Sequence, residues 1–113
     1  VSKARQQVIE RLRGVDLHSV NLRYANLYES DLTEANLSGA DLTGASLVET
    51  TLDMANFFGA TLEGTNLTAA SVNMTVFRNA HLKGAILNEV DLRKAAMTMG
   101  QRVAYMLKGS SGL

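Results

Sequence analysis

Two histidines, a glycine-rich stretch and several carboxylates are the residues of this 113-residue chain that could carry chemistry. His18 and His81 are candidate metal ligands or general bases, but they lie far apart in the sequence. In the coiled fold deduced below, their separation is about three coils, or roughly 14 Å along the axis, which excludes joint ligation. We therefore expect both histidines to be solvated surface residues, and we predict no metal site.

The remaining chemical motifs are weak. The stretch "GATLEGTN" (residues 59–66) has the glycine spacing of a phosphate-binding loop but lacks its lysine. Tripeptides that begin at Asn36, Asn66 and Asn73 match a glycosylation acceptor. The repeat described below generates Asn-Leu-Ser/Thr from its own consensus, so these matches do not indicate glycosylation. No Ser, Thr or Lys has neighbours that would activate it, and the carboxylates lie on a convex wall without a water-excluding pocket. The sequence thus predicts no catalytic residue, no cofactor and no small-molecule substrate, which means that the protein is not an enzyme.

An apolar residue recurs at every fifth position from Leu17 to Met97, which gives 17 unbroken quintets. With this residue as position i, position i−2 is small or β-branched, i−1 is mostly Asp, Asn, Ser or Thr, and i+1 and i+2 are mostly polar or Gly. Neither an α-helix nor a β-strand has a period of five. A chain that turns a corner after every five residues satisfies the pattern, because i−2 and i then point inward and backbone groups pair with the adjacent coils.

A period of five fits both three-sided and four-sided coils, and a second period favours four sides. Phe57 and Phe77 are separated by four quintets, and so are Met54 and Met74. A turn of four quintets would stack these like residues on neighbouring rungs, where like side chains pair favourably. The 17 quintets then form about four and a quarter coils, roughly 20 Å tall.

The open ends of such a stack would expose unpaired backbone edges, and the flanking segments are predicted to cover them. Residues 1–14 are predicted to form an N-terminal capping helix that begins at Ser2 and ends at Gly14. Residues 15–99 are predicted to form the repeat domain, and residues 100–113 a short C-terminal cap and a flexible tail. The apolar face of the C-terminal cap is expected to consist of Val103, Met106 and Leu107.

The quintets in "YANLYESDLTEANLSGADLTGA" resemble the A(D/N)LXX repeats of the pentapeptide repeat family, over about Val15 to Met99. The resemblance implies a right-handed quadrilateral β-helix, so the predicted fold is an all-β solenoid of about four coils with a cap at each end. It also implies a family common in bacteria, in which most members have no assigned activity and a minority protect DNA gyrase from quinolones by mimicking DNA. The chain departs from the family pattern at position i−1 of its last quintets, which holds Val76, His81, Ile86 and Ala96.

The charges are unevenly distributed although the net charge is zero. Between Tyr24 and Phe77 there are seven acidic residues and no Lys or Arg. These acids either keep the outer wall soluble and protect its edges or form a surface that resembles DNA. The predicted DNA-mimic surface consists of Glu29, Asp31, Glu34, Glu49, Asp53 and Glu63.

Apolar residues at outward positions form the second surface feature. Met54 and Met74 stack at one corner, with Val76 and Phe58 just around it, and Ile86 points outward elsewhere. Single exposed apolar residues are ordinary, but several close together indicate a contact surface. The predicted partner contact consists of Met54, Phe58, Met74, Val76 and Ile86.

The function predicted from the sequence is a non-enzymatic scaffold or protein–protein interaction module, and the alternative is a DNA mimic that binds a topoisomerase such as DNA gyrase. We expect a protein partner or self-association, with no direct contact to nucleic acid. No apolar run approaches the length of a membrane span, so no span is predicted. The cytoplasm is the favoured compartment, while the thylakoid lumen and the periplasm stay open if a leader was removed.

Overall fold

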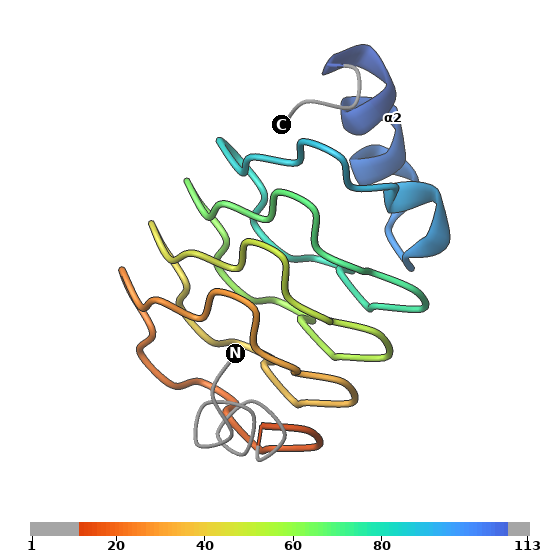
Figure 1. The fold of residues 1–113 in the computed structure, drawn as a ribbon. Coiled ribbons are helices and arrows are strands. Elements are labelled where there is room, and N and C mark those ends of the chain that lie inside the picture. The colour runs from red at the N-terminus through yellow and green to blue at the C-terminus, as the bar shows by residue number, and fades with distance from the viewer. Residues whose placement is uncertain (1–11, 109–113) are drawn as a thin grey trace.

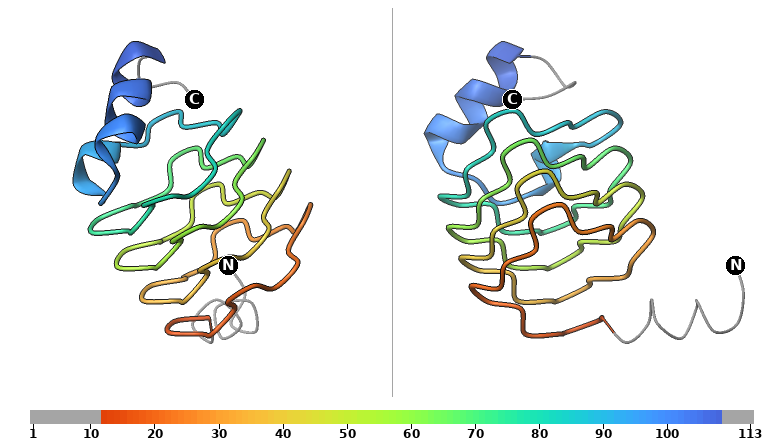
Figure 2. Two further views of the ribbon diagram at one scale, coloured as in Figure 1. Left: turned by 180° about the vertical axis from the view of Figure 1, so that it is seen from behind. Right: turned by 90° about the vertical axis from the view of Figure 1, so that its left-hand side faces the viewer.

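A computed structural model describes residues 12–108, which form a stack of coils followed by a helix (Figure 1). Parallel bridges join each paired residue to the one four quintets later, from Asp16–Asn36 to Val76–Ala96. Leu17 N donates to Asn36 O (2.7 Å), and Asn36 N donates to Val15 O (2.9 Å). One turn of the coil therefore contains four quintets, as the sequence predicts, and Figure 2 shows the coils lying in register from two further directions.

The sides of the coil are not continuous strands. Within residues 12–108 the bridges are isolated, one per side, and they all fall at position i−1. A turn in each quintet interrupts the extended backbone: Ala35 N donates to Leu32 O (2.9 Å), and Glu34 between them has a positive φ of 61°. A positive φ at the third residue alone is the pattern of a type II turn. This left-handed residue occurs at position i+2 of each quintet from Gly14 to Glu89.

The polar residue at position i−1 has a structural function that explains its preference for Asp and Asn. Its side-chain oxygen accepts a hydrogen bond from the backbone N–H two residues later, as between Asp41 Oδ1 and Thr43 N or between Asn36 Oδ1 and Ser38 N (3.0 Å each). Short Asp and Asn side chains are suited to this local bond because they reach the backbone without straining it. Each quintet with Asp or Asn at i−1 thereby stabilises its own corner.

The interior of the coil is filled by the residues at positions i and i−2. Leu at i and Ala at i−2 are buried from Leu32 onward, whereas Leu in the first coil is only half-buried. The rings of Phe57 and Phe77 stack, with centroids 5.3 Å apart and planes inclined at 21°. Where Thr replaces Ala, its hydroxyl donates to a backbone carbonyl, as Thr65 Oγ1 does to Leu42 O (2.7 Å), so its burial carries little penalty.

Two short helices lie at the C-terminal side of the described residues, the first within the last coil and the second after it. The 3₁₀-helix η1 spans Leu92–Lys94, and the α-helix α2 spans Met99–Lys108. At the start of α2, Thr98 and Gln101 form a reciprocal capping box: Thr98 N donates to Gln101 Oε1 (2.8 Å) and Gln101 N donates to Thr98 Oγ1 (3.2 Å). The predicted N-terminal helix, by contrast, lies mainly outside the described residues.

The side of α2 that faces the coil differs from the side that the sequence predicts. Gln101 and Tyr105 contact the coil, whereas Val103, Met106 and Leu107 are exposed. The reason is that the last coil offers backbone carbonyls, which attract hydrogen-bond donors rather than aliphatic side chains. No helix within residues 12–108 is long and apolar enough to cross a membrane.

Adjacent phenylalanines provide a matched test of this inside–outside alternation. Phe57 is fully buried and Phe58 is half exposed. We expect Phe57→Ala to lower the free energy of unfolding by about 3–5 kcal/mol, because it removes a stacked ring and leaves a cavity. Phe58→Ala should cost less than about 1 kcal/mol. Urea unfolding followed by circular dichroism measures both, and equal losses for the two variants would contradict the assigned register.

Candidate interaction surfaces

An apolar corner, defined by Met54, Met74, Phe58 and Val76, runs along one side of the coil. Met54 and Met74 occupy the left-handed position i+2 of successive coils, with φ of 60° and 57°. Their backbones are fixed by hydrogen bonds from Met54 N to Asn73 O (2.9 Å) and from Met74 N to Lys94 O (2.8 Å). Their side chains nevertheless remain 48% and 70% exposed. The corner therefore presents flexible apolar side chains on a rigid backbone.

The next quintet of each coil contributes the other two members of the apolar corner. Phe58 is half exposed, and Val76 is partly covered at a position that is bridged to both Asn56 and Ala96. Ile86, the fifth predicted contact residue, is exposed but bridged to Asn66, half a turn of the coil away from Val76. The structure thus brings four of the five predicted residues to one side and leaves Ile86 on another.

Two of the six predicted DNA-mimic carboxylates, Asp31 and Asp53, are held by contacts that link coils of the protein. Asp31 lies 3.5 Å from the guanidinium of Arg13 and also accepts hydrogen bonds from Thr33. Asp53 accepts hydrogen bonds from Ser71 Oγ (2.6 Å) and from Asn73 N (3.0 Å), so it links two coils. Both side chains stabilise the coil, and their negative charge is partly compensated.

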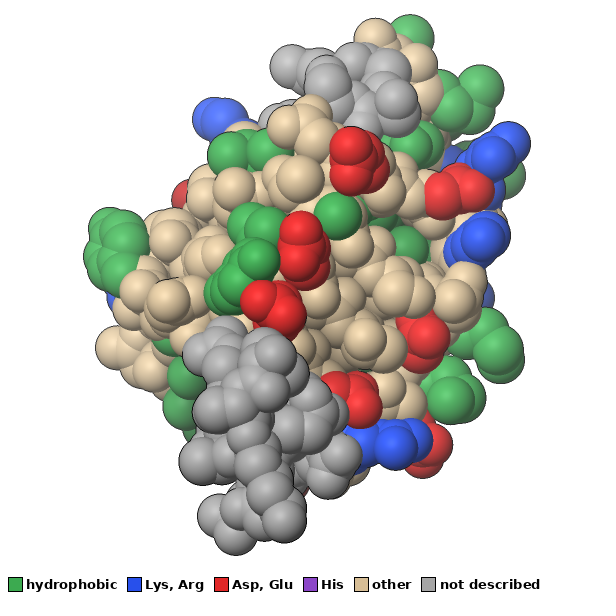
Figure 3. Space-filling model, viewed as in Figure 1, with side chains coloured by type: hydrophobic (Ala, Val, Ile, Leu, Met, Phe, Trp, Pro, Cys, Tyr) green, Lys and Arg blue, Asp and Glu red, His purple; other side chains and the backbone are tan. Residues whose placement is uncertain are grey.

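The other four carboxylates lie on three different lines of the coil. Glu29 and Glu49 stack one turn of the coil apart, and Glu34 is at the next corner. Glu63 lies on the side bridged through Asp41, Thr61 and His81, half a turn of the coil away from the side between those two corners. Figure 3 shows acidic side chains on one face of the molecule, interleaved with polar and hydrophobic ones. The carboxylates therefore do not form one continuous acidic strip.

Tyr28 contacts the paired glutamates. Its hydroxyl donates to Glu49 Oε2 (3.2 Å), and hydrogen bonding to Glu29 and Glu49 raises the pKa of Tyr28 above its ordinary value of 10.0. The cause is that a phenolate at this position would stand beside negative carboxylates. This ring therefore reports the local electrostatic potential of the acidic residues.

The two histidines lie apart and exposed, as expected. His18 Nδ1 is 2.7 Å from Asp16 Oδ1, and this hydrogen bond lowers the pKa of Asp16. His81 is exposed on a later coil. Among residues 12–108, no group of three His, Cys, Asp or Glu side chains is arranged to hold a metal ion.

Sequence reasoning missed two exposed apolar features. The first is Tyr24, 71% exposed, whose ring has the Arg23 guanidinium 5.6 Å from its centroid and covers Gly44 of the next coil. The second is the outer face of α2. The position of Tyr24 at i+2 was a usable signal, because that position always faces outward in this fold, whereas nothing in the sequence states which face of α2 meets the coil.

Together, the four-quintet turn and the buried ladder of small and apolar residues define a solenoid repeat protein. The family model "Pentapeptide repeats" matches residues 11–47, 25–64, 35–73 and 60–98, with 8 copies. The chain therefore belongs to the pentapeptide repeat family. Members of this family are generally structural or interaction modules rather than enzymes.

Several solved structures are similar to this chain. The pentapeptide repeat protein Rfr23 from the cyanobacterium Cyanothece 51142 is 38% identical, over 74% of this chain and 60% of that protein, with a TM-score of 0.40. AT2G44920, a pentapeptide repeat protein from the Arabidopsis thaliana thylakoid lumen, is 23% identical over 86% and 78%, with a TM-score of 0.47. QnrB1, a plasmid-mediated fluoroquinolone resistance protein, is 25% identical over 73% and 45%, with a TM-score of 0.34.

The chain thus covers 60% of the Cyanothece protein, which is less than two thirds of its length. Comparison with curated protein sequences gives no match.

Neutralising one glutamate tests the electrostatics of the acidic residues. Glu49→Gln should lower the pKa of Tyr28 toward 10.0, because it removes a charge but keeps a hydrogen-bond acceptor. A pH titration of the Tyr28 ring signals by NMR measures the shift. Glu63→Gln, on another side of the coil, is the control and should leave that pKa unchanged. An unchanged pKa in Glu49→Gln would show that the carboxylate does not act on this ring.

Proposed function

We propose that this protein is a non-enzymatic protein-interaction module whose contact surface is the apolar corner. The proposed scaffold is a right-handed, four-sided β-helix of about four coils that spans residues 15–99. It is closed by residues 1–14 at one end and by residues 100–113 at the other. In this proposal the scaffold holds the corner rigid, and the partner is another protein or a second copy of the chain.

The observation that carries the proposal is the placement of two methionines where neither stability nor solubility favours them. A left-handed conformation costs a residue other than Gly about 1–2 kcal/mol. Exposed methionine side chains offset little of this free energy, since they bury little apolar surface. One corner further on in the same coils, the equivalent positions hold Gly59 and Asn79, so the fold itself has no need of methionine here. Flexible, polarizable methionine side chains suit a contact surface that adapts to its partner.

The DNA-mimic alternative has less support. Glu29, Glu34, Glu49 and Glu63 remain as its carboxylates, but Arg13 and Arg23 bind Asp31 and Asp41 at the same end of the coil. A surface that imitates DNA needs a continuous series of uncompensated negative charges. A DNA gyrase supercoiling assay with a quinolone separates the two functions, because protection of the enzyme would favour the mimic.

Paired lysine substitutions test the apolar corner. Met54→Lys with Met74→Lys should abolish self-association in sedimentation velocity, or the capture of a specific partner in a pull-down, because two charges replace the apolar contact. Gly64→Lys with Gly84→Lys is the control, since these residues have the same left-handed conformation half a turn away. An added Cβ there meets no atom closer than 3.6 Å.

The control variant should keep its binding, and thermal unfolding verifies that both variants are folded. If the methionine variant associates like the unsubstituted chain, the apolar corner is not the contact surface.

A further inference from the structure

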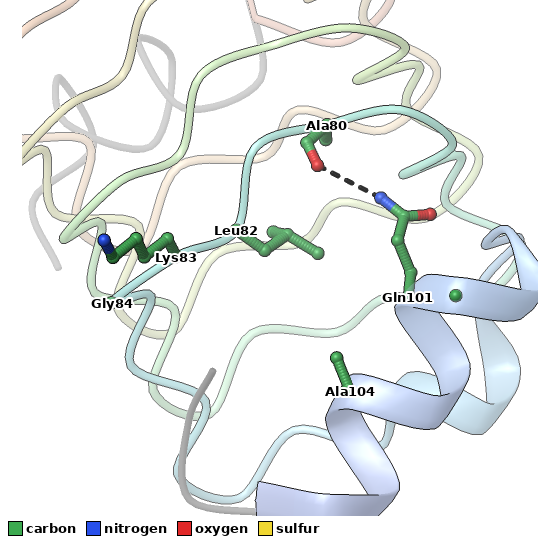
Figure 4. A pocket seen from close by; sticks show the side chains of 7 residues that line it. Ala80, Leu82, Lys83, Gly84, Gln101 and Ala104 are labelled. Carbon is green, nitrogen blue, oxygen red and sulfur yellow. Dashed lines mark hydrogen bonds between the residues drawn. The ribbon is translucent and has the colours of Figure 1, made fainter.

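Helix α2 is fastened to the coil by polar groups on one of its faces. Gln101 Nε2 donates to Phe77 O (2.7 Å) and to Ala80 O (3.1 Å), and Tyr105 OH donates to Val90 O (3.3 Å). Gln101 and Tyr105 are four residues apart, so they lie on the same side of the helix. This side is directed at the end of the coil, as Figure 4 shows for Gln101.

The opposite face of α2 is an apolar stripe exposed to solvent. At about 100° per residue, the stripe is centred on the side of the helix away from Gln101 and Tyr105. Met106 and Leu107 are 77% and 82% exposed. The stripe consists of Met99, Val103, Met106 and Leu107. An apolar face of this kind is usually buried, and nothing within residues 12–108 covers this one.

One flank of the stripe continues into an apolar pocket. A pocket of about 580 Å³ opens between α2 and the end of the coil (Figure 4). It is lined on the helix by the small residues Gly100 and Ala104, and on the coil by Ala80 and Leu82. The pocket is open to solvent along α2, so the apolar surface extends from the helix onto the end of the coil. The side chain of Lys83 lies at the rim and points away from the helix.

The segment that contains the apolar stripe is rich in positive charge. Between Arg78 and Lys108 the sequence has six Lys or Arg residues and two acids, and α2 contains no acid. One of the two acids, Asp91, already binds Arg93 (2.9 Å). Arg102 lies on α2 itself, beside the stripe, and is exposed. Its Nη2 donates to Ala95 O (3.4 Å), which leaves the other N–H donors of the guanidinium for a further partner. Figure 3 shows hydrophobic and basic side chains next to each other at this end of the molecule.

We propose that α2 binds the surface of an anionic lipid bilayer. The stripe inserts between the headgroups, parallel to the membrane plane, while Arg102 and its basic neighbours contact lipid phosphates. The helix lies at one extremity of the molecule, so a flat surface reaches it without meeting the coil (Figure 1). A second copy of the chain fits less well, because two basic ends would repel each other and stable interfaces use about 20–30 residues a side. This surface is independent of the apolar corner.

Co-sedimentation of the full chain with vesicles tests the proposal. The chain should bind vesicles of equal parts phosphatidylglycerol and phosphatidylcholine, and bind phosphatidylcholine vesicles much more weakly. Met106→Glu with Leu107→Glu should reduce the partition coefficient more than about tenfold. Arg102→Gln should reduce it about fivefold. Met54→Glu with Met74→Glu is the matched control, since it places the same charges on another exposed methionine pair, and it should still bind.

Absence of binding to the anionic vesicles, or equal binding to both vesicle types, would overturn the proposal. A second result would also overturn the proposal: the unsubstituted chain does not bind vesicles but forms an oligomer, and the Met106/Leu107 variant is monomeric. The stripe would then bind a second copy of the chain. The Met54/Met74 variant distinguishes the two proposals, because it removes the apolar corner and leaves α2 unchanged.

A fluorescent reporter tests the orientation of the bound helix. The chain has no Trp, so Met106→Trp and Met74→Trp each contain a single tryptophan, whose emission is excited selectively over that of the three tyrosines. On addition of the anionic vesicles, the emission of Met106→Trp should shift to shorter wavelength while that of Met74→Trp stays unchanged. No shift at residue 106, or the same shift at both residues, would contradict insertion through the face of α2.

Discussion

Hydrogen bonding between backbone groups one turn of the coil apart is the interaction on which the rest of this protein depends. Each coil donates upward from positions such as Leu17 N and downward from positions such as Asn36 N, so successive coils stay in register. That register requires the chain to close after four corners, and each corner requires a left-handed residue at i+2. The buried column of Leu and Phe and the short bonds from Asp and Asn are consequences of this closure, because they fill and stabilise a path that the backbone already defines.

Because inward and turn-forming residues maintain the fold, binding specificity can reside only in the outward side chains. Inward residues are largely Ala, Thr, Leu and a stacked Phe pair, and position i−1 is mostly occupied with its own turn. Side chains at positions i+1 and i+2 mostly face solvent, and the left-handed backbone at i+2 accepts several residue types. This allows Met54 and Phe58 in some quintets and Tyr24 or Tyr28 in others. The fold is thus shared with the family, whereas the arrangement of outward side chains belongs to this chain. The backbone therefore presents outward side chains at a fixed spacing, while the types of these side chains vary from quintet to quintet.

The period of five and the recurrence of like residues after four quintets were sufficient to predict the coil, because both are imposed by local geometry that repeats along the chain. The same periodicity predicted that Met54, Phe58, Met74 and Val76 share one side. It could not predict that Asp53 binds Ser71 or that Asp31 binds Arg13, since those bonds depend on rotamers and on neighbours one coil away. The orientation of α2 could not be predicted either, because it depends on hydrogen bonds from Gln101 and Tyr105 to carbonyls of the coil rather than on the apolar pattern of the helix.

The side-chain amide of Gln101 couples the formation of α2 to its attachment to the coil. The oxygen of its amide begins α2 by accepting from Thr98 N, and the nitrogen of the same amide holds the helix on Phe77 O and Ala80 O. Nucleating a helix as short as α2 is unfavourable without such help. Docking and helix formation are therefore coupled, because one side chain both caps the helix and attaches it to the coil. Loss of the Gln101 amide would remove both contributions at once.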